Sequence, residues 1–146
     1  MPERSVSHHT FSLDRSYDVP PSRVFAAWAD QAEKRRWWAG GDDSLELDFR
    51  IGGREVNRGG PEGGPVFTYD ARYQDIVDGE RIVYTYDMLL DRIRISVSVA
   101  TAEFGPERNG TRLVFTEQGA FLDGHETADR RQHGMGSLLD SLGRWL

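Results

Sequence analysis

Residues 67–88 read FTYDARYQDIVDGERIVYTYDM, and the spacing of their apolar side chains indicates the fold class. Aromatic or apolar residues alternate with polar ones on both sides of the Asp78-Gly79 pair. Such alternation is typical of a β-strand with one buried face, and Asp-Gly is a common hairpin turn. The stretch therefore predicts two antiparallel strands that carry four tyrosines at alternating positions: Tyr69, Tyr73, Tyr84 and Tyr86.

The alternating pattern continues on both sides of this hairpin. Upstream, a glycine-rich loop at 59–65 separates it from two shorter strands that meet at Gly52-Gly53. Downstream, Ile93, Ile95, Val97 and Val99 are expected on one strand face, Asn109-Gly110 begins a last strand, and a loop follows at 119–124. Six strands joined by short turns predict an antiparallel meander with one packed face. The four additional strands are expected at 45–49, 54–57, 92–100 and 113–117.

The two ends of the chain supply a first strand and three helices. Residues 10–17 alternate imperfectly and predict a strand, which the Pro20-Pro21 pair ends. A short amphipathic helix follows through Trp28, and Asp30 with Glu33 forms a capping-box pattern that begins a second short helix, ended by residues 39–41. A long C-terminal helix is predicted from one apolar stripe: Met135, Leu138, Leu139, Leu142, Trp145 and Leu146.

This order of elements predicts an α+β fold in one domain over residues 1–146. One helix cannot cover a flat sheet of seven strands. A curved seven-stranded antiparallel sheet wrapped around the long C-terminal helix solves the burial problem, with the two short helices between the first and second strands closing one end. Such an arrangement tends to leave a cavity between helix and sheet.

Six stretches of the sequence resemble the motifs of a known family. They are VPPSRVFAAWAD (19–30), RRWW (35–38), IGGR (51–54), YQDIVDGERIVYTY (73–86), GTRLVFTEQG (110–119) and SLLDSL (137–142). With the order of the elements, they resemble the helix-grip superfamily of START domains, Bet v 1-like proteins and polyketide cyclases. Within it, the chain is most similar to the family related to the C-terminal domain of the activator of the heat-shock protein 90 ATPase. One departure is Met135 after Gly134, where many members have tryptophan.

The balance of charge argues against nucleic acid as a partner. The chain has 18 Lys and Arg residues against 24 Asp and Glu residues, a formal net charge of −6. Nonspecific binding to nucleic acid needs a basic surface. The run Lys34-Arg35-Arg36 is therefore interpreted as a solvated face of the second short helix.

The sequence also indicates where the protein works. It has no cysteine, which excludes thiolate metal sites and cysteine nucleophiles. It begins Met-Pro-Glu-Arg-Ser without an apolar run, and no stretch has the apolar length of a membrane span. We therefore expect a cytoplasmic protein without a membrane partner.

No metal ion or cofactor is expected. His8 and His9 would point to opposite faces of a strand, and His125 and His133 are too far apart in sequence for a helical ligand pair. The glycine-rich loop at 59–65 lacks the Lys-Ser/Thr of a phosphate-binding loop, and no Gly-x-Ser-x-Gly motif is present.

The expected cavity is the candidate site. An apolar pocket with a few convergent polar groups is the usual small-molecule site, and burial would shift Glu117 or His133 toward useful acid–base pKa values. Alternatively, the strand tyrosines simply favour the sheet, and Glu117 pairs with an arginine. Arg131 is assigned to the solvent face of the last helix or, as a second option, to the cavity mouth as an anion ligand. The candidate lining residues are Trp28, Trp37, Trp38, Tyr69, Tyr73, Tyr84, Tyr86, Ile95, Glu117, Phe121, His133, Met135 and Leu138.

Adjacent tryptophans on the second short helix point in different directions. Neighbouring helical residues diverge by about 100°, so Trp37 and Trp38 cannot face one surface. One is expected to anchor the helix on the sheet and the other to line the cavity, but the sequence does not assign these roles.

Three functions remain open. The first is a binding protein for a small hydrophobic or aromatic molecule, without a catalytic residue. The second, by analogy with related folds, is a cyclase- or hydratase-type enzyme that uses a cavity acid or base. The third, implied by the resemblance, is an activator of a chaperone ATPase, although that activator has a further N-terminal domain. A homodimer is also possible.

Overall fold

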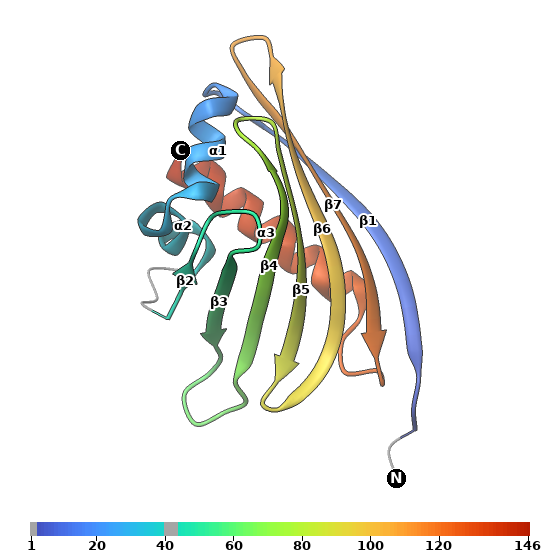
Figure 1. The fold of residues 1–146 in the computed structure, drawn as a ribbon. Coiled ribbons are helices and arrows are strands. Elements are labelled where there is room, and N and C mark those ends of the chain that lie inside the picture. Colours follow the sequence, from blue (N-terminus) through green and yellow to red (C-terminus); the bar gives the residue numbers. More distant parts are fainter. Residues whose placement is uncertain (1–2, 40–43) are drawn as a thin grey trace.

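The computed structural model describes residues 3–39 and 44–146. Seven strands form one antiparallel sheet in the order β1-β7-β6-β5-β4-β3-β2, which confirms the predicted fold class. The sheet is curved, and α3 lies across its concave side (Figure 1). The strands are β1 (Val6–Tyr17), β2 (Glu46–Leu47), β3 (Arg54–Gly59), β4 (Phe67–Val77), β5 (Arg81–Leu90), β6 (Ile93–Glu107) and β7 (Gly110–Leu122).

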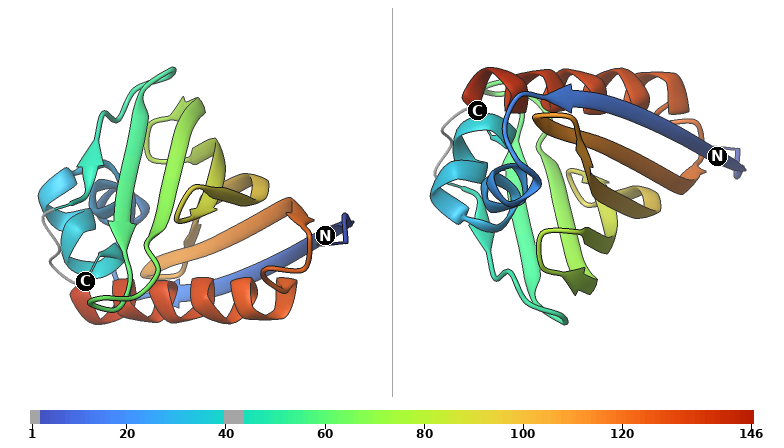
Figure 2. Two further views of the ribbon diagram at one scale, coloured as in Figure 1. Left: turned by 90° about the horizontal axis from the view of Figure 1, so that it is seen from below. Right: turned by 90° about the horizontal axis from the view of Figure 1, so that it is seen from above.

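Three helices cover the open side of this sheet. They are α1 (Pro21–Ala29), α2 (Gln31–Trp38) and α3 (Ala128–Trp145). Viewed from either end, α3 runs alongside β1 and β7, while α1 and α2 close the end of the sheet near the C-terminus (Figure 2). Among the helices that the structure describes, none is long and apolar enough to span a bilayer.

The junction between α1 and α2 follows the predicted cap only in part. The Asp30 carboxylate accepts hydrogen bonds from the backbone amides of Ala32 (2.8 Å) and Glu33 (3.4 Å), as an N-cap residue does. The reciprocal bond from Glu33 is replaced, because the Asp30 amide donates to Ala26 at the end of α1. Glu33 instead pairs with Arg23 and accepts a hydrogen bond from the indole of Trp145, which ties α2 to the end of α3.

Several strand boundaries differ from the predicted ones. β1 begins at Val6 instead of residue 10, and β2 is only two residues long, so Phe49 lies outside it. The predicted loop begins later than residue 119, because β7 continues to Leu122 by pairing with β1. Pairing between the first and last strands, which no local pattern reveals, sets the ends of β1 and β7.

The prediction that Ile93, Ile95, Val97 and Val99 share one face of β6 is also wrong. Met88 pairs with Ser96 and Leu89 with Arg94, so Ile95 is an extra residue at a β-bulge. The bulge leaves Ile95 and Ser96 both buried and inverts the alternation after them. The side chains of Val97 and Val99 are consequently exposed, and the interior face of β6 carries small residues: Ser96, Ser98, Ala100 and Ala102.

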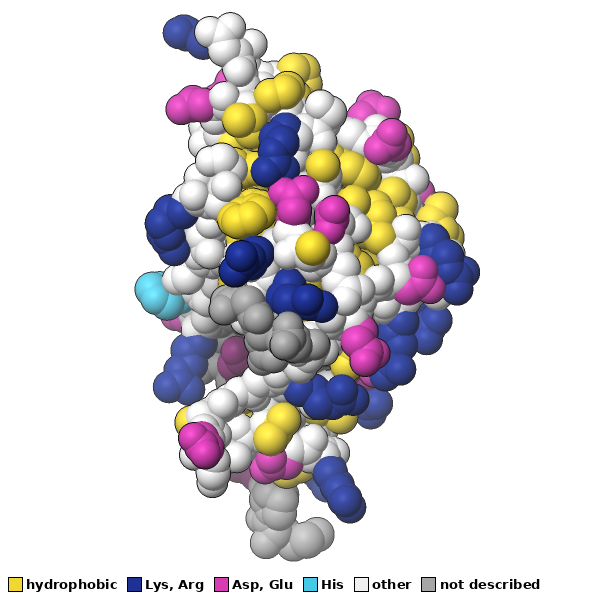
Figure 3. Space-filling model, turned by 90° about the vertical axis from the view of Figure 1, so that its left-hand side faces the viewer, with side chains coloured by type: hydrophobic (Ala, Val, Ile, Leu, Met, Phe, Trp, Pro, Cys, Tyr) yellow, Lys and Arg dark blue, Asp and Glu magenta, His cyan; other side chains and the backbone are white. Residues whose placement is uncertain are grey.

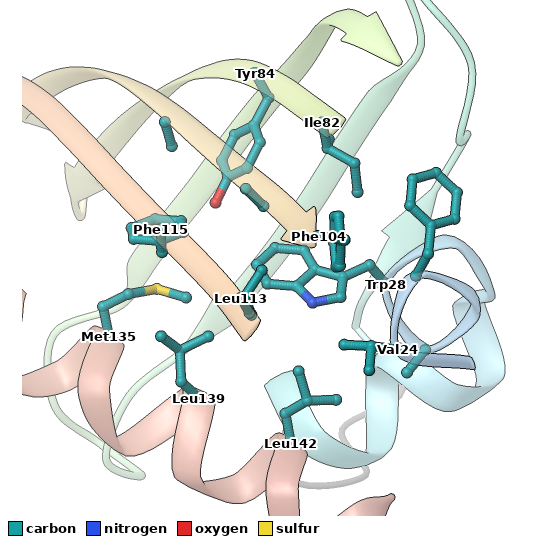
Figure 4. Close-up of a cluster of buried hydrophobic side chains, with 14 of the residues drawn as sticks. Val24, Trp28, Ile82, Tyr84, Phe104, Leu113, Phe115, Met135, Leu139 and Leu142 are labelled. Carbon is teal, nitrogen blue, oxygen red and sulfur yellow. The ribbon is translucent and has the colours of Figure 1, made fainter. Parts of the chain in front are cut away.

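The core fills the space between the sheet and the three helices. Trp28 of α1 is its largest fully buried side chain, with its ring 5.0 Å from Trp37 and 6.1 Å from Phe104 between ring centroids. Leu139 and Leu142 approach it from α3 (Figure 4). This packing occupies the end of the sheet near α1 and leaves a pocket toward the other end of α3.

Candidate functional site

A pocket of about 320 Å³ lies between α3 and the β4–β5 hairpin. The alternation of side chains in β4 and β5 directs Tyr69, Tyr84 and Tyr86 to one wall of this pocket, and α2 contributes Trp38 to the same wall. We call it the α3 pocket. Its lining residues are Trp38, Tyr69, Tyr84, Tyr86, Met88, Glu117, Glu126, Arg130, Arg131, Gly134, Met135 and Leu138.

Aromatic rings form a continuous wall on one side of the pocket. The ring centroids of Trp38 and Tyr69 are 5.3 Å apart, those of Tyr69 and Tyr86 are 4.8 Å apart, and those of Tyr84 and Tyr86 are 6.0 Å apart. Met135 and Leu138 of α3 face this wall together with Met88. The pocket therefore presents mainly apolar and π surface to whatever enters it.

A buried arginine connects α3 to the sheet at one side of the pocket. The Arg131 guanidinium donates to the Tyr86 hydroxyl (2.7 Å), Ser96 Oγ (2.7 Å) and Glu126 Oε2 (2.6 Å). It also lies 3.1 Å from Glu117 Oε2. Arg131 is only 7% exposed, so its assignment to the solvent face of the last helix is wrong. We call these five residues the Arg131 network.

Glu117 is held from several directions. The Tyr86 hydroxyl lies 2.8 Å from each of its carboxylate oxygens, and Ser98 Oγ donates to Oε2 at 3.0 Å. Burial and the charge of Glu117 raise the pKa of Tyr86 above its ordinary value, which keeps this donor protonated. Glu117 therefore lines the pocket and pairs with an arginine, the second of the two alternatives left open for it.

Two tyrosine hydroxyls of the pocket lack such partners. Tyr69 is 6% exposed and Tyr84 is 1% exposed. Neither hydroxyl makes a hydrogen bond of ordinary geometry with a described residue, and a weak contact between the two hydroxyls acts to lower the pKa of Tyr84 against the larger effect of burial. Figure 4 shows the Tyr84 hydroxyl directed from β5 toward α3. Burial raises the pKa of both hydroxyls well above the ordinary value, so both remain protonated.

A second buried ionic cluster lies behind the aromatic wall. Lys34 Nζ is 2.7 Å from Glu55 Oε1, which also accepts a hydrogen bond from the Tyr73 hydroxyl. The ammonium lies 4.4 Å from the ring centroid of Trp38, a cation–π distance. We call Lys34, Glu55 and Tyr73 the Lys34 cluster. It is not among the residues that line the pocket, but it supports the ring of Trp38 from behind.

The solvated-face interpretation of residues 34–36 is therefore wrong for its first residue. Lys34 is completely buried, whereas Arg36 is exposed. On the face seen in Figure 3, which bears α1 and α2, basic and acidic side chains are intermixed. Lys34 neutralises a carboxylate of β3 and adds nothing to the surface charge.

The structure separates the two adjacent tryptophans. Trp37 is 2% exposed and its indole donates to the backbone oxygen of Ala27 (2.9 Å), which anchors α2 to α1. Trp38 is half-buried and lines the α3 pocket.

The remaining five candidate residues lie in five different places. Tyr73 belongs to the Lys34 cluster, and Trp28 is in the core beside Trp37. Phe121 is buried with its ring centroid 5.0 Å from the Arg131 guanidinium carbon. Ile95 is buried at the bulge and His133 is exposed on α3, and neither lines the pocket. The candidates that line the pocket are Trp38, Tyr69, Tyr84, Tyr86, Glu117, Met135 and Leu138.

Several lining residues were not predicted from the sequence. Arg131 was predicted at the cavity only as a second option, although it stands four residues before Met135 and eight before Leu139, on the apolar stripe of α3. Met88 continues the alternation of Tyr84 and Tyr86 and could have been found the same way. The others carry no local signal: Glu126, Arg130 and Gly134.

The described residues offer no cluster of side chains for a metal ion. Across residues 3–39 and 44–146, no group of three or more His, Asp or Glu side chains is arranged to hold a metal ion.

Comparisons with known proteins agree with this fold. A family model described as "Activator of Hsp90 ATPase homolog 1-like protein" matches residues 18–146. The solved structure of Mll3558 from Rhizobium loti is 46% identical, with 97% of this chain and 99% of that chain covered and a TM-score of 0.93. A putative uncharacterized protein from Rhizobium leguminosarum is 41% identical (98% and 97% covered, TM-score 0.93). CV1439 from Chromobacterium violaceum, 24% identical (92% and 94% covered, TM-score 0.76), shares the fold. No curated protein matched.

Proposed function

The chain belongs to the Activator of Hsp90 ATPase homolog 1-like protein family, as its motifs indicated, and we propose that it binds an apolar small molecule in the α3 pocket. The observation that carries this proposal is the pocket itself, about 320 Å³ in volume and walled by aromatic rings, two methionines and a leucine. Small-molecule sites are typically of this size and character, with a few polar groups that fix orientation.

The contacts of Glu117 favour binding over acid–base catalysis. The Tyr86 hydroxyl lies within hydrogen-bond distance of both of its oxygens, which share its one proton, and Ser98 and Arg131 donate to the second oxygen. A general base must reach the proton that it removes, and here proton transfer would require breaking these contacts. The carboxylate is therefore better suited to fixing β7, β5 and α3 around the pocket.

Methionine methyl groups provide a direct test of where a ligand binds. Met88 and Met135 both line the pocket, so ¹³C-methyl labelling of methionine places two reporters inside it. We expect a panel of uncharged aromatic compounds to include some that shift both signals in a saturable way. Shifts of neither signal by any compound that binds the protein would contradict the proposal.

A pocket-filling variant supplies the control. Gly134 lines the pocket, and a Cβ at this position would meet no atom within 4 Å, so Gly134→Phe can place a ring over the opening without a backbone clash. His133→Phe adds a ring at the neighbouring exposed position outside the lining. We expect Gly134→Phe to weaken binding by tenfold or more, a loss on the order of the free energy of one buried apolar contact. His133→Phe should leave the affinity unchanged.

A further inference from the structure

The polar groups of the α3 pocket are unequally satisfied. In the Arg131 network, the guanidinium and the Glu117 carboxylate are engaged by partners within the protein. The hydroxyls of Tyr69 and Tyr84 make no hydrogen bond of ordinary geometry with a described residue beyond a weak contact with each other, although both side chains are more than nine-tenths buried. Buried polar groups in native proteins are nearly always hydrogen-bonded, so two neighbouring exceptions in one pocket point to a ligand group.

The two hydroxyls are neighbours. Their rings lie on the adjacent strands β4 and β5, 6.5 Å apart between centroids. Burial raises the pKa of Tyr84, and a weak contact between the two hydroxyls acts to lower it. Each protonated hydroxyl offers one donor, and an oxygen acceptor has two lone pairs. One ligand oxygen between them would satisfy both.

The charge of the pocket selects against an anion. The carboxylates of Glu117 and Glu126 offset the guanidinium groups of Arg130 and Arg131, so the lining carries no surplus positive charge. Lys34, behind the wall, is neutralised by Glu55. Arg131 is paired with Glu117 and Glu126, and Arg130 lies at the exposed rim of the pocket. Beside Tyr69 and Tyr84, a ligand carboxylate would therefore lose its hydration without meeting an unpaired cation, which is costly.

We propose that Tyr69 and Tyr84 jointly donate hydrogen bonds to a single oxygen acceptor of an uncharged aromatic ligand, whose ring system lies against Trp38 and Tyr86. This inference rests on the proposed function and adds the chemistry of the ligand. The preferred class is a planar molecule with a carbonyl-type oxygen on its buried edge. Pure hydrocarbons leave the two hydroxyls unsatisfied, and carboxylates face the charge penalty.

Three matched probes test this preference. Fluorene, 9-fluorenone and fluorene-9-carboxylate share one ring system and differ in the group at a single carbon. We expect wild-type protein to bind fluorenone at least about fivefold more tightly than fluorene, with the carboxylate weakest, in line with one or two hydrogen bonds to otherwise unsatisfied groups. The carbonyl stretching band of bound fluorenone should move to lower frequency, as it does when the oxygen accepts hydrogen bonds.

Tyrosine-to-phenylalanine variants assign the effect to residues. Tyr69→Phe and Tyr84→Phe each remove one donor and keep the ring, so both should lower the fluorenone-to-fluorene affinity ratio, and the double variant should bring it near one and abolish the infrared shift. Tyr17→Phe is the matched control, because the Tyr17 hydroxyl donates to the Leu139 backbone oxygen away from this pocket. It should leave the ratio unchanged.

The outcomes separate the two proposals. Equal binding of fluorene and fluorenone by the wild-type protein, or an unchanged ratio in the double variant, overturns the role of the two hydroxyls while the binding function stands. Failure of all three probes to bind or to shift the Met88 and Met135 methyl signals contradicts the binding function for aromatic molecules and this inference with it. Thermal unfolding of each variant confirms that the fold is retained.

Discussion

Lys34 Nζ lies 2.7 Å from Glu55 Oε1, and neither side chain has any exposed surface. The pair joins α2 to β3 directly behind Trp38, whose ring lies 4.4 Å from the ammonium. Burying two charges is costly, and their attraction repays that cost only when both partners are present. The ion pair therefore fixes the position of the helix that carries one wall of the pocket, and it does so only as a complete unit.

Removal of one partner of this ion pair should therefore lower the stability of the fold strongly. We expect Lys34→Met to lower the free energy of unfolding by about 3–5 kcal/mol, because it leaves Glu55 as an uncompensated buried charge. The double variant Lys34→Met/Glu55→Gln should recover much of this loss, since glutamine is neutral and still accepts a hydrogen bond from Tyr73. Urea denaturation of the single and double variants measures both effects. Arg36→Met, at an exposed position of the same helix, is the control and should change stability by less than about 0.5 kcal/mol.

The five tyrosines should make the protein sensitive to alkali. Burial is the largest cause that raises the pKa of each one above about 10, its value in the unfolded chain. A raised pKa means that folding favours the protonated form, so this contribution to stability is complete below about pH 10 and falls as the pH rises further. Burial lowers the pKa of Lys34, and this shift makes stability rise with pH. One lysine is outweighed by the five tyrosines.

The expected loss of stability at high pH can be tested by a titration. We expect no tyrosinate absorbance to develop in the folded protein near pH 10, and all five tyrosines to ionise together when the protein unfolds at higher pH. Near-ultraviolet absorbance and circular dichroism, recorded on the same samples, measure ionisation and folding. A tyrosine that ionises near pH 10 while the circular dichroism stays native would contradict the prediction.

Local patterns were sufficient for the architecture. Alternation in residues 67–88 directs four tyrosines to the interior because strand side chains have a period of two, and that period does not depend on the rest of the fold. The same reasoning failed in β6, where the bulge at Ile95 shifts the register by one residue. A one-residue shift exchanges the two faces of a strand, and its position depends on pairing with β5, which the local sequence does not specify.

The candidate site was predicted only in outline. The tyrosine row and Met135 follow from periodicity, whereas the choice of Trp38 over Trp37 does not. The buried charges do not follow from composition, because a charged side chain is usually exposed. Lys34 and Arg131 each stand on the apolar stripe of a helix, at i and i+3 or i+4 from Trp37, Trp38 or Met135. Their buried acidic partners, Glu55 and Glu117, lie on strands far away in the sequence, so the pairing that makes such burial tolerable was visible only in the structure.

Gly134 should tolerate alanine with a gain in stability. Glycine inside a helix costs about 0.5–1 kcal/mol relative to alanine, and a Cβ at Gly134 would meet no atom within 4 Å. We expect Gly134→Ala to raise the free energy of unfolding by that amount in chemical denaturation. Gly143→Ala gains the same helix propensity, but its Cβ would lie 3.2 Å from the buried ring of Tyr17 and should offset the gain. Equal stabilisation by the two variants would argue against this account.

Asp30 should contribute the stability typical of an N-cap. Its carboxylate accepts hydrogen bonds from the amides of Ala32 and Glu33 at the start of α2. We expect Asp30→Ala to cost about 1 kcal/mol in thermal or urea unfolding. Asp30→Asn keeps a side-chain acceptor at the same position and should cost only a few tenths of that amount. A loss of equal size in both variants would mean that the charge, and not the cap, is responsible.

Arg131 should be the most sensitive residue of the α3 pocket. Arg131→Met removes the cation that faces Glu117 and leaves this carboxylate buried, so we expect a loss of about 3–5 kcal/mol in urea unfolding. Arg131→Lys should recover only part of the loss, because one ammonium cannot reach the set of acceptors that the planar guanidinium spans on three elements of the fold. Arg131→Met/Glu117→Gln removes the orphaned charge and should be more stable than Arg131→Met alone.

The neighbouring arginine separates the ionic network from general effects of charge on α3. Arg130 also lines the pocket but is exposed, so Arg130→Met should change the free energy of unfolding by less than about 0.5 kcal/mol. The comparison is decisive because both variants remove one positive charge from adjacent positions of the same helix. If Arg131→Met were no more destabilising than Arg130→Met, the buried contacts to Glu117 would not be holding α3 against the sheet.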